Sequence, residues 1–143
     1  MIADSNTLEA ARIRAAKIAA ELSQFTGSDC VYRHSLNPGV VYSEGVRYLA
    51  QEASAYWLID AITSYFGSPE MRRALSRDGR LADLQFWQLV VTEESAELTM
   101  RADSGVAPAI TQRIAFTDFP LPEANIWAGY DGHRWTLYLP SEH

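Results

Sequence analysis

The apolar residues of the chain follow a helical period in its first half and alternate in its second half. Between residues 7 and 24 they recur every three or four positions, which predicts an amphipathic helix whose apolar stripe leans on the rest of the protein. A second helix is predicted from Ser43 to about Phe66. The stripe of the first helix consists of Leu8, Ala11, Ala15, Ile18, Leu22 and Phe25.

Capping signals mark the ends of both predicted helices. Asn6 followed by Glu9 has the spacing of a capping box, and Gly27 is suited to end the first helix. Ser43 is a good N-terminal cap for the second helix, and Gly67-Ser68-Pro69 is a typical stop.

From residue 84 onward the pattern changes to the alternation of β-strands. An earlier hairpin is predicted around Asn37-Pro38-Gly39, and a two-residue hairpin turn at Asp131-Gly132. Between helices and strands, residues 70–80 are polar and predict a short helix with a turn at Asp78-Gly79. The predicted strands cover residues 31–35, 40–42, 84–91, 96–102, 109–116, 125–130 and 133–139.

This order of elements predicts an α+β fold. We expect two main helices packed on a mostly antiparallel sheet of about five to seven strands, with the early hairpin supplying two of them. Residues 1–143 are expected to form a single domain, in which residues 1–6 are flexible.

Composition narrows the class of protein. The 143 residues are 48% hydrophobic, which is typical of a globular domain, and no run of about eighteen apolar residues predicts a membrane span. A single cysteine excludes an internal disulfide framework, so we expect a cytoplasmic protein. The net charge of −6 opposes binding to phosphate backbones, and nucleic acid is not the expected partner.

The second predicted helix places one carboxylate among aromatic side chains. A step of about 100° per residue puts Asp60, Tyr56 and Thr63 on the polar face, with Trp57 beside them, opposite an apolar face that includes Leu58. Asp60 is therefore either a solvated carboxylate or, if this face is covered, one that needs a hydrogen-bond donor. The donors considered are Arg33, Arg47, a tyrosine hydroxyl and a backbone amide.

Several blocks of sequence together resemble an uncharacterised bacterial family of single-domain proteins, found also in phages and mobile elements. The similarity extends from about residue 20 to the end. It implies a compact protein and a mobile-element setting, but no reaction. The blocks are residues 22–28, Tyr32-Arg33-His34, residues 42–49, Tyr56-Trp57-Leu58-Ile59-Asp60, Phe86-Trp87-Gln88-Leu89, Thr117-Asp118-Phe119-Pro120 and Leu139-Pro140-Ser141-Glu142.

Known catalytic motifs do not match the chain. It has neither a phosphate-binding glycine loop nor a nucleophile elbow, and its histidines and cysteine lack metal-ligand spacing, so we expect no metal or cofactor. Cys30 and His34 would lie about 13 Å apart on one strand, too far for a nucleophile–base pair. His34 is expected to pack or to bond locally at the hairpin, and Asp118 to cap a turn.

Two groups of residues remain as candidate binding sites. The first is a pocket lined by Tyr56, Trp57, Asp60, His34 and Asp118. The second is the arginine segment 72–80, with Arg72, Arg73 and Arg77, which is either a solvated helix or a contact site for phosphate or an acidic partner.

The sequence favours a non-catalytic protein-interaction or accessory protein from a phage or mobile element. One form of this would be an anti-defence inhibitor, such as an inhibitor of a CRISPR complex. The alternative is a small enzyme or ligand-binding domain that uses the Tyr/Trp/Asp/His pocket. The expected partner is a protein, and a homodimer remains open.

Overall fold

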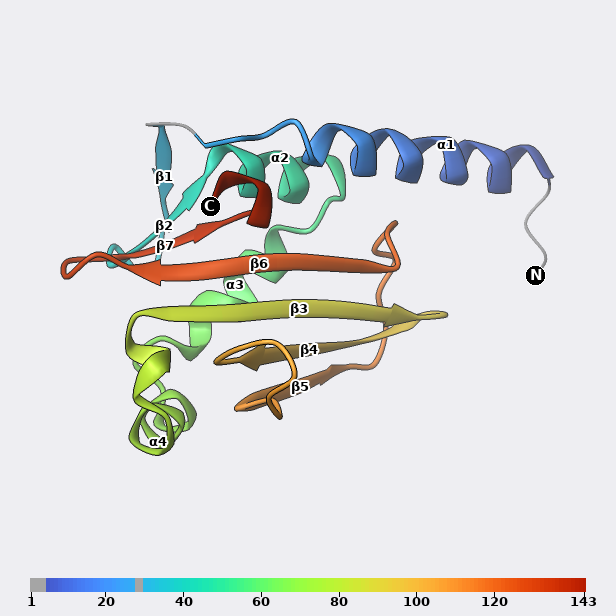
Figure 1. The fold of residues 1–143 in the computed structure, drawn as a ribbon. Helices are drawn as coiled ribbons and strands as arrows, with labels where there is room; N and C mark the ends of the chain where they lie inside the picture. The colour runs from blue at the N-terminus through green and yellow to red at the C-terminus, as the bar shows by residue number, and fades with distance from the viewer. Residues whose placement is uncertain (1–4, 28–29) are drawn as a thin grey trace.

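The structure is a computed structural model that describes residues 5–27 and 30–143. Its described part contains one seven-stranded sheet and four α-helices, so the predicted α+β fold is confirmed (Figure 1). The helices are α1 (Ser5–Leu22), α2 (Glu44–Glu52), α3 (Tyr56–Tyr65) and α4 (Pro69–Arg77), with 3-10 helices η1 (Gly79–Ala82) and η2 (Pro140–Glu142). The strands are β1 (Val31–Arg33), β2 (Val40–Ser43), β3 (Leu84–Thr92), β4 (Ser95–Arg101), β5 (Ile110–Ile114), β6 (Glu123–Tyr130) and β7 (Trp135–Tyr138).

The sheet has the strand order β1-β2-β7-β6-β3-β4-β5. Strands β3 to β7 form the predicted antiparallel set, and the early hairpin β1–β2 extends the sheet by pairing β2 with β7 in parallel. The expectation that the hairpin contributes two strands is therefore correct. The parallel pair brings a segment near residue 40 beside the C-terminal strand.

Helices cover one face of the sheet. In Figure 1, α3 lies behind β6 and β3, α2 lies near the upper edge of the sheet, and α4 lies beyond the start of β3. The alternation of β3 explains this layering, because Gln85, Trp87 and Leu89 are buried while Phe86 and Gln88 are only half-buried on the other face. The core therefore lies between α3 and the buried side of β3.

The prediction of one helix from Ser43 to Phe66 is wrong. Ser43 does cap a helix, since its hydroxyl accepts a hydrogen bond from the Val46 N–H at 3.2 Å, but that helix ends at Glu52. Ser54 then takes a positive φ of 52°, which ends the helical path before α3 starts. The break contains neither glycine nor proline, so it has no local signal in the sequence.

The first helix also differs from its prediction. It already includes Asn6, so the Asn6–Glu9 capping box is wrong, and it ends at Leu22 rather than near Gly27. Residues 1–4 of the segment predicted to be flexible lie outside the described residues. The apolar stripe contacts the body only in its second half: Ile18 is 2% exposed, whereas Leu8 is 47% exposed.

The β6–β7 connection and the burial of Thr63 also differ from their predictions. The β6–β7 connection is a four-residue loop, residues 131–134, rather than a two-residue turn. The Asp131 carboxylate shapes this loop by accepting hydrogen bonds from the His133 and Arg134 N–H groups, both at 2.9 Å. In α3, Thr63 was predicted on the polar face but is buried, as are Ile59 and Ile62 next to it on the helix.

Tyr48 joins α2 to α1. Its hydroxyl donates a hydrogen bond to the Glu21 carboxylate, and its ring lies 5.2 Å from that of Phe25. Burial, followed by the hydrogen bond to Glu21, raises the pKa of Tyr48 from 10.0 to about 12. Both effects disfavour the tyrosinate in the folded protein.

An alkaline titration should reveal this contact. A raised folded pKa means that the stabilising contribution of Tyr48 is fully present below pH 10 and is lost as the pH rises towards 12. Tyrosinate absorbance should thus keep rising to about pH 12, and Tyr48→Phe should remove the last part of this rise. A difference between the two curves centred near pH 10 would contradict the assignment.

Candidate functional site

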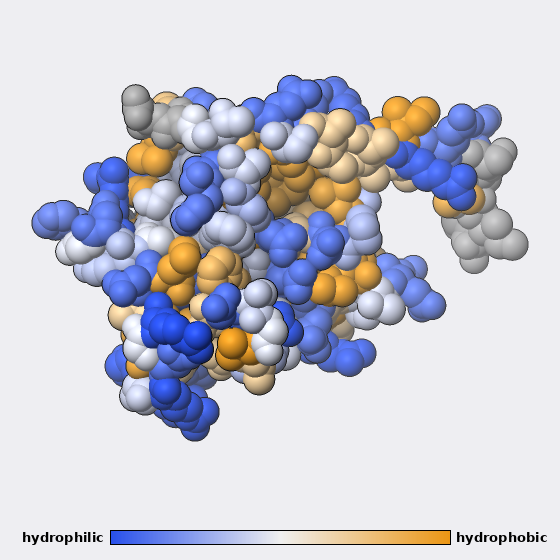
Figure 2. Space-filling view, in the orientation of Figure 1, coloured by the Kyte–Doolittle hydropathy of each residue, from blue (hydrophilic) through white to orange (hydrophobic). Residues whose placement is uncertain are grey.

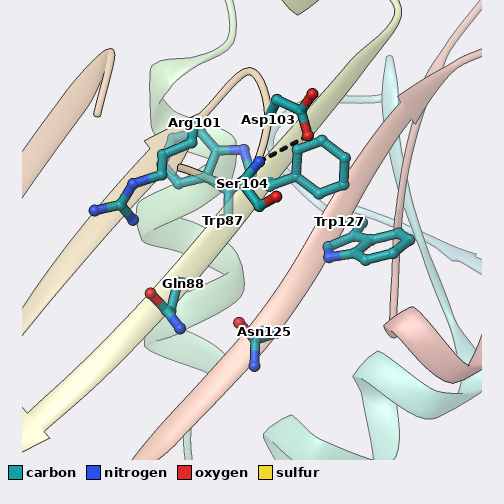
Figure 3. Close-up of a pocket in the computed structure, with 8 residues that line it drawn as sticks. Trp87, Gln88, Arg101, Asp103, Ser104, Asn125 and Trp127 are labelled. Atoms are coloured by element: carbon teal, nitrogen blue, oxygen red, sulfur yellow. Dashed lines mark hydrogen bonds between the residues drawn. The ribbon is translucent and has the colours of Figure 1, made fainter. Parts of the chain in front are cut away.

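The face of the sheet turned away from α2 and α3 carries a groove in the described part of the chain. Its cavity volume is about 430 Å³, and side chains from β3, β4 and β6 and from the β4–β5 loop line it (Figure 3). We call it the sheet-face groove. Its lining residues are Phe86, Trp87, Gln88, Arg101, Asp103, Ser104, Asn125 and Trp127.

Aromatic rings form one wall of the groove. Phe86 and Trp127 are cross-strand partners whose rings meet edge to face, with centroids 4.9 Å apart. Trp127 also contacts Tyr138 at 6.2 Å and His143 at 5.1 Å, so that β7 and the C-terminal residue support its indole. The supported, half-buried Trp127 offers a fixed apolar surface to a ligand.

Two amide side chains lie side by side next to this wall. Gln88 and Asn125 are opposite each other in the β3–β6 register. Gln88 donates a hydrogen bond to Glu123 at 2.9 Å, whereas the Asn125 amide has no hydrogen bond to another described residue. Asn125 therefore keeps its donors and acceptor for a bound group.

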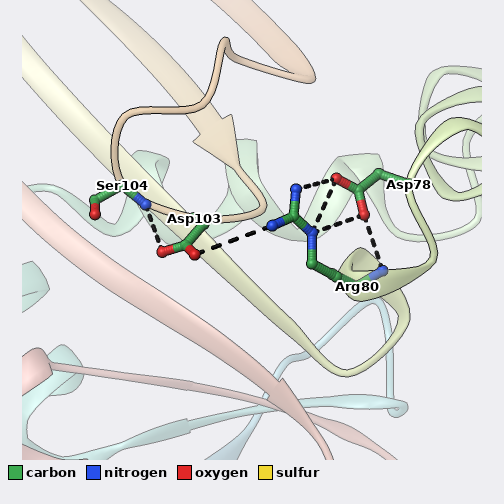
Figure 4. A network of polar contacts seen from close by, with 4 residues as sticks. All are labelled: Asp78, Arg80, Asp103 and Ser104. Carbon is green, nitrogen blue, oxygen red and sulfur yellow. Dashed lines mark hydrogen bonds and ion pairs between the residues drawn. The ribbon is translucent and has the colours of Figure 1, made fainter.

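A polar network holds the rim of the groove in place. Asp103 accepts a hydrogen bond from the Ser104 N–H at 2.7 Å and lies 4.0 Å from the Arg80 guanidinium (Figure 4). Arg80 in turn makes several hydrogen bonds to the Asp78 carboxylate, the shortest at 2.7 Å. The Arg80 side chain and backbone N–H hold the pKa of Asp78 below its usual value. The network ties the β4–β5 loop to η1.

Arg101 provides the basic side chain of the groove. Its Nε donates to the Val106 carbonyl at 3.0 Å and its Nη1 to the Thr99 hydroxyl at 2.9 Å. Together with Asp103 on the rim, it leaves the lining close to neutral. This balance favours a ligand of low net charge over a phosphate backbone.

The structure brings together two residues of the pocket predicted from sequence. His34 follows β1, and its Nε2 lies 2.8 Å from Oδ1 of Asp60 on α3. The Asp60 side chain is 67% exposed and that of His34 is 6% exposed. Asp60 lies on the polar face of α3, as predicted. Its hydrogen-bond donor is His34, which was not among the donors predicted for it.

Backbone contacts fix the tautomer of His34. Its Nδ1 accepts hydrogen bonds from the N–H groups of Leu36 and Asn37, both at 3.2 Å, as the prediction of local bonding at the hairpin required. The proton is therefore on Nε2 and is donated to Asp60. With both ring nitrogens engaged, His34 has no nitrogen left to act on Cys30 or on a substrate.

Tyr56 belongs to a neighbouring group of aromatic and charged side chains, which we call the tyrosine–arginine patch: Tyr32, Tyr42, Arg47 and Tyr56. The Arg47 guanidinium lies 4.5 Å from the Tyr32 ring centroid and donates to the Tyr32 hydroxyl at 2.9 Å. Burial, followed by the proximity of Tyr56, raises the pKa of Tyr42. The patch fixes the exposed end of α2 against β1 and β2.

The remaining predicted residues lie elsewhere. Trp57 packs its ring against Phe119, 6.4 Å away, and Asp118 is exposed next to Phe119 in the chain. Arg72, Arg73 and Arg77 are exposed on α4. None of the eight residues predicted as binding sites lines the sheet-face groove or any of four smaller cavities, all formed by described residues.

Metal-ligand groups and membrane-spanning helices are both absent from the described residues. Among residues 5–27 and 30–143, no group of three or more His, Cys, Asp or Glu side chains could hold a metal ion. In the same residues, no helix has both the length and the apolar character needed to cross a membrane.

The sheet-face groove was not predicted from the sequence. The signal was present in Phe86-Trp87, because adjacent aromatic residues in one strand must point to opposite faces. Trp87 lies on the buried face, where its ring is 5.6 Å from Tyr65 of α3. Phe86 must then face the other side. Pairing with Trp127 depends on the β3–β6 register, which a single sequence does not show.

The comparisons with known proteins give few matches. A family model described as "Family of unknown function (DUF6876)" matches residues 16–143. A solved structure of a protein of unknown function from Enterococcus faecalis is 22% identical to this chain, covers 73% of this chain and 90% of its own, and has a TM-score of 0.49. The comparison with curated proteins gives no match.

Proposed function

The chain belongs to the family of unknown function DUF6876, and we propose that it is a non-catalytic binding protein that holds a partner polypeptide in the sheet-face groove. The observation that carries this proposal is the arrangement of Trp127, Phe86 and Asn125 in a cavity of about 430 Å³. Trp is one of the residue types enriched in protein-binding hot spots, and the amide beside it can bind the polar groups of a partner.

The chemistry of the groove supports a polypeptide as the ligand. An aromatic wall suits an apolar side chain, and the Asn125 amide suits the N–H and C=O groups of a peptide backbone. The opposite charges of Arg101 and Asp103 and the net charge of −6 both disfavour a nucleic acid. The engaged ring nitrogens of His34 support a non-catalytic role.

The sequence adds a finer proposal about the partner. In the phage or mobile-element setting that the resemblance implies, the partner would be a cytoplasmic component of a bacterial defence system, and binding would inhibit it. The ligand-binding alternative would use the partly buried contact between His34 and Asp60 next to Tyr56. It predicts a small molecule at α3 instead of a polypeptide on the sheet.

Photo-crosslinking tests the proposal. A photoreactive amino acid in place of Gln88 should form a discrete covalent adduct with a polypeptide in a bacterial lysate, and the additional change Trp127→Ala should abolish it. The matched control carries the same amino acid in place of Arg72, which is exposed on α4. Circular dichroism would show whether the Trp127→Ala variant remains folded.

Three outcomes would overturn this function. They are an equally strong adduct at position 72, an adduct at position 88 that survives Trp127→Ala, and labelling at position 88 of nucleic acid or a small molecule only.

A further inference from the structure

The N-terminal half of α1 projects beyond the body of the protein. Figure 1 shows α1 along the upper edge of the sheet and extending past the ends of the strands, and Figure 2 shows this part standing free of the surface below. The contacts of α1 to the body begin at Arg14, whose guanidinium donates to the Glu52 carbonyl at 2.5 Å. They continue with the buried Ile18 and with the Leu22 carbonyl, which accepts a hydrogen bond from the Ser141 hydroxyl at 3.3 Å. We call residues 8–17 the arm.

The apolar stripe of α1 continues from the packed half into the arm. Leu8 shares a helical face with Ile18 and Leu22 but is 47% exposed, while Ile13, on the opposite face, is 63% exposed. An isolated helical segment of about ten residues is marginal in water, so packing against another surface would stabilise the arm.

A groove of suitable character lies directly below α1. It has a volume of about 310 Å³ and is lined by α1, by the start of β6 and by the C-terminal segment. Its apolar lining includes Leu22, Leu121 and Leu139, and Glu123 lies at its side. An apolar side chain near a basic one would fit it.

The end of the sheet next to this groove is acidic. Glu123, Val90 and Glu97 form a row across β6, β3 and β4, and Val90 is 42% exposed. The Val91 N–H donates to the Pro122 carbonyl at 2.8 Å, so the β3–β4 turn with Glu93 and Glu94 adjoins the groove. This end therefore carries four carboxylates, those of Glu93, Glu94, Glu97 and Glu123. Of these, Glu97 lies opposite a basic residue, Arg113, in the β4–β5 register.

The arm has the complementary charge. Arg12, Arg14 and Lys17 outweigh Glu9, which gives residues 8–17 a net charge of +2. Arg12 lies one turn after Leu8 on the same face, so a Leu8 side chain inserted in the groove would place Arg12 beside the carboxylates. Complementary charge next to an apolar contact sets the register of an interface.

We propose that two copies of this chain form a symmetric dimer, in which the arm of each lies antiparallel below α1 of the other. Leu8 of one copy inserts into the groove between α1 and β6 of its partner, and Arg12 pairs with the partner's Glu123. The contact is self-complementary, as a twofold axis requires. Asn125 lines both this groove and the sheet-face groove, but the dimer contact uses Leu8 and Arg12 against the partner's groove and does not depend on the proposed function.

Sedimentation velocity tests this proposal on the full chain. The wild-type protein should sediment as a species of twice 16.0 kDa and dissociate on dilution or at high salt. Leu8→Glu should leave a monomer with unchanged circular dichroism, since Leu8 has no part in the core. Ile13→Glu is the matched control on the opposite face of α1, and it should retain the dimer.

Charge exchange gives the decisive comparison. Arg12→Glu and Glu123→Arg should each weaken dimerisation by at least about tenfold, and the double variant should restore it to within about threefold of the wild type. A wild-type monomer at all concentrations, a dimer insensitive to Leu8→Glu, or a double variant as weak as the single ones would overturn the proposal. So would a monomer whose arm captures another protein or a nucleic acid.

Discussion

Replacing Gln85 with alanine should lower the free energy of unfolding by about 3 kcal/mol. Gln85 is fully buried in β3, where its amide donates to the Leu81 carbonyl at 3.1 Å and accepts from the Trp87 indole at 3.0 Å. Alanine would leave both of these buried groups without a partner and would create a cavity beside Met71. These three costs act together, which makes the expected effect large.

Gln88→Ala is the matched control for this prediction. It changes the same residue type in the same strand, but on the open face of the sheet, where Gln88 contacts Glu123. We expect a change within about 0.5 kcal/mol. Urea unfolding followed by circular dichroism measures both variants, and similar losses in the two would show that the faces of β3 are wrongly assigned.

Gly45→Ala should destabilise the protein by about 2 kcal/mol, although alanine ordinarily favours a helix over glycine by up to about 1 kcal/mol. A Cβ at position 45 would lie 2.5 Å from Oε1 of Glu142 and 2.7 Å from Cδ1 of Leu139. The Glu142 carboxylate cannot move away freely. It accepts hydrogen bonds from the Ser43 hydroxyl at 2.6 Å, the Gly45 N–H at 3.3 Å and the Leu139 N–H at 2.9 Å.

This contact joins the start of α2 to the C-terminal segment, and two controls isolate it. Gly79→Ala places a Cβ in open space and should change stability by less than about 0.5 kcal/mol. In a Glu142→Ala background, Gly45→Ala should cost less, because two of the three closest atoms belong to Glu142 and only the Leu139 contact remains. An unchanged cost in that background, or a stabilising effect of Gly45→Ala in the wild type, would contradict this role of Glu142.

The sequence predicted the elements of this fold better than their interruptions. The alternation from residue 84 onward identified the antiparallel strands because each has one buried face, as in Gln85, Trp87 and Leu89. The break at Ser54 was missed because residues 52–55 contain good helix formers. Ala53 and Ala55, on either side of Ser54, are both buried, so tertiary packing stabilises the turn.

The candidate site was harder to predict than the fold. The contact between His34 and Asp60 joins residues 26 positions apart, and the pairing of Phe86 with Trp127 depends on strand register. A helical projection can place Asp60 on the polar face of α3, but it cannot show which hairpin residue lies opposite. Long-range contacts of this kind require the sheet order, in which β6 lies between β7 and β3.

The central claim is that the open face of β3 and β6 recognises a partner polypeptide, and calorimetric titration of the crosslinked partner tests it most directly. Trp127→Ala should weaken binding by about thirtyfold or more, the loss expected for an aromatic hot spot of about 2 kcal/mol. Arg72→Ala, on α4, should bind like the wild type. Equal affinities for wild type and Trp127→Ala, or a loss confined to Arg72→Ala, would contradict the claim.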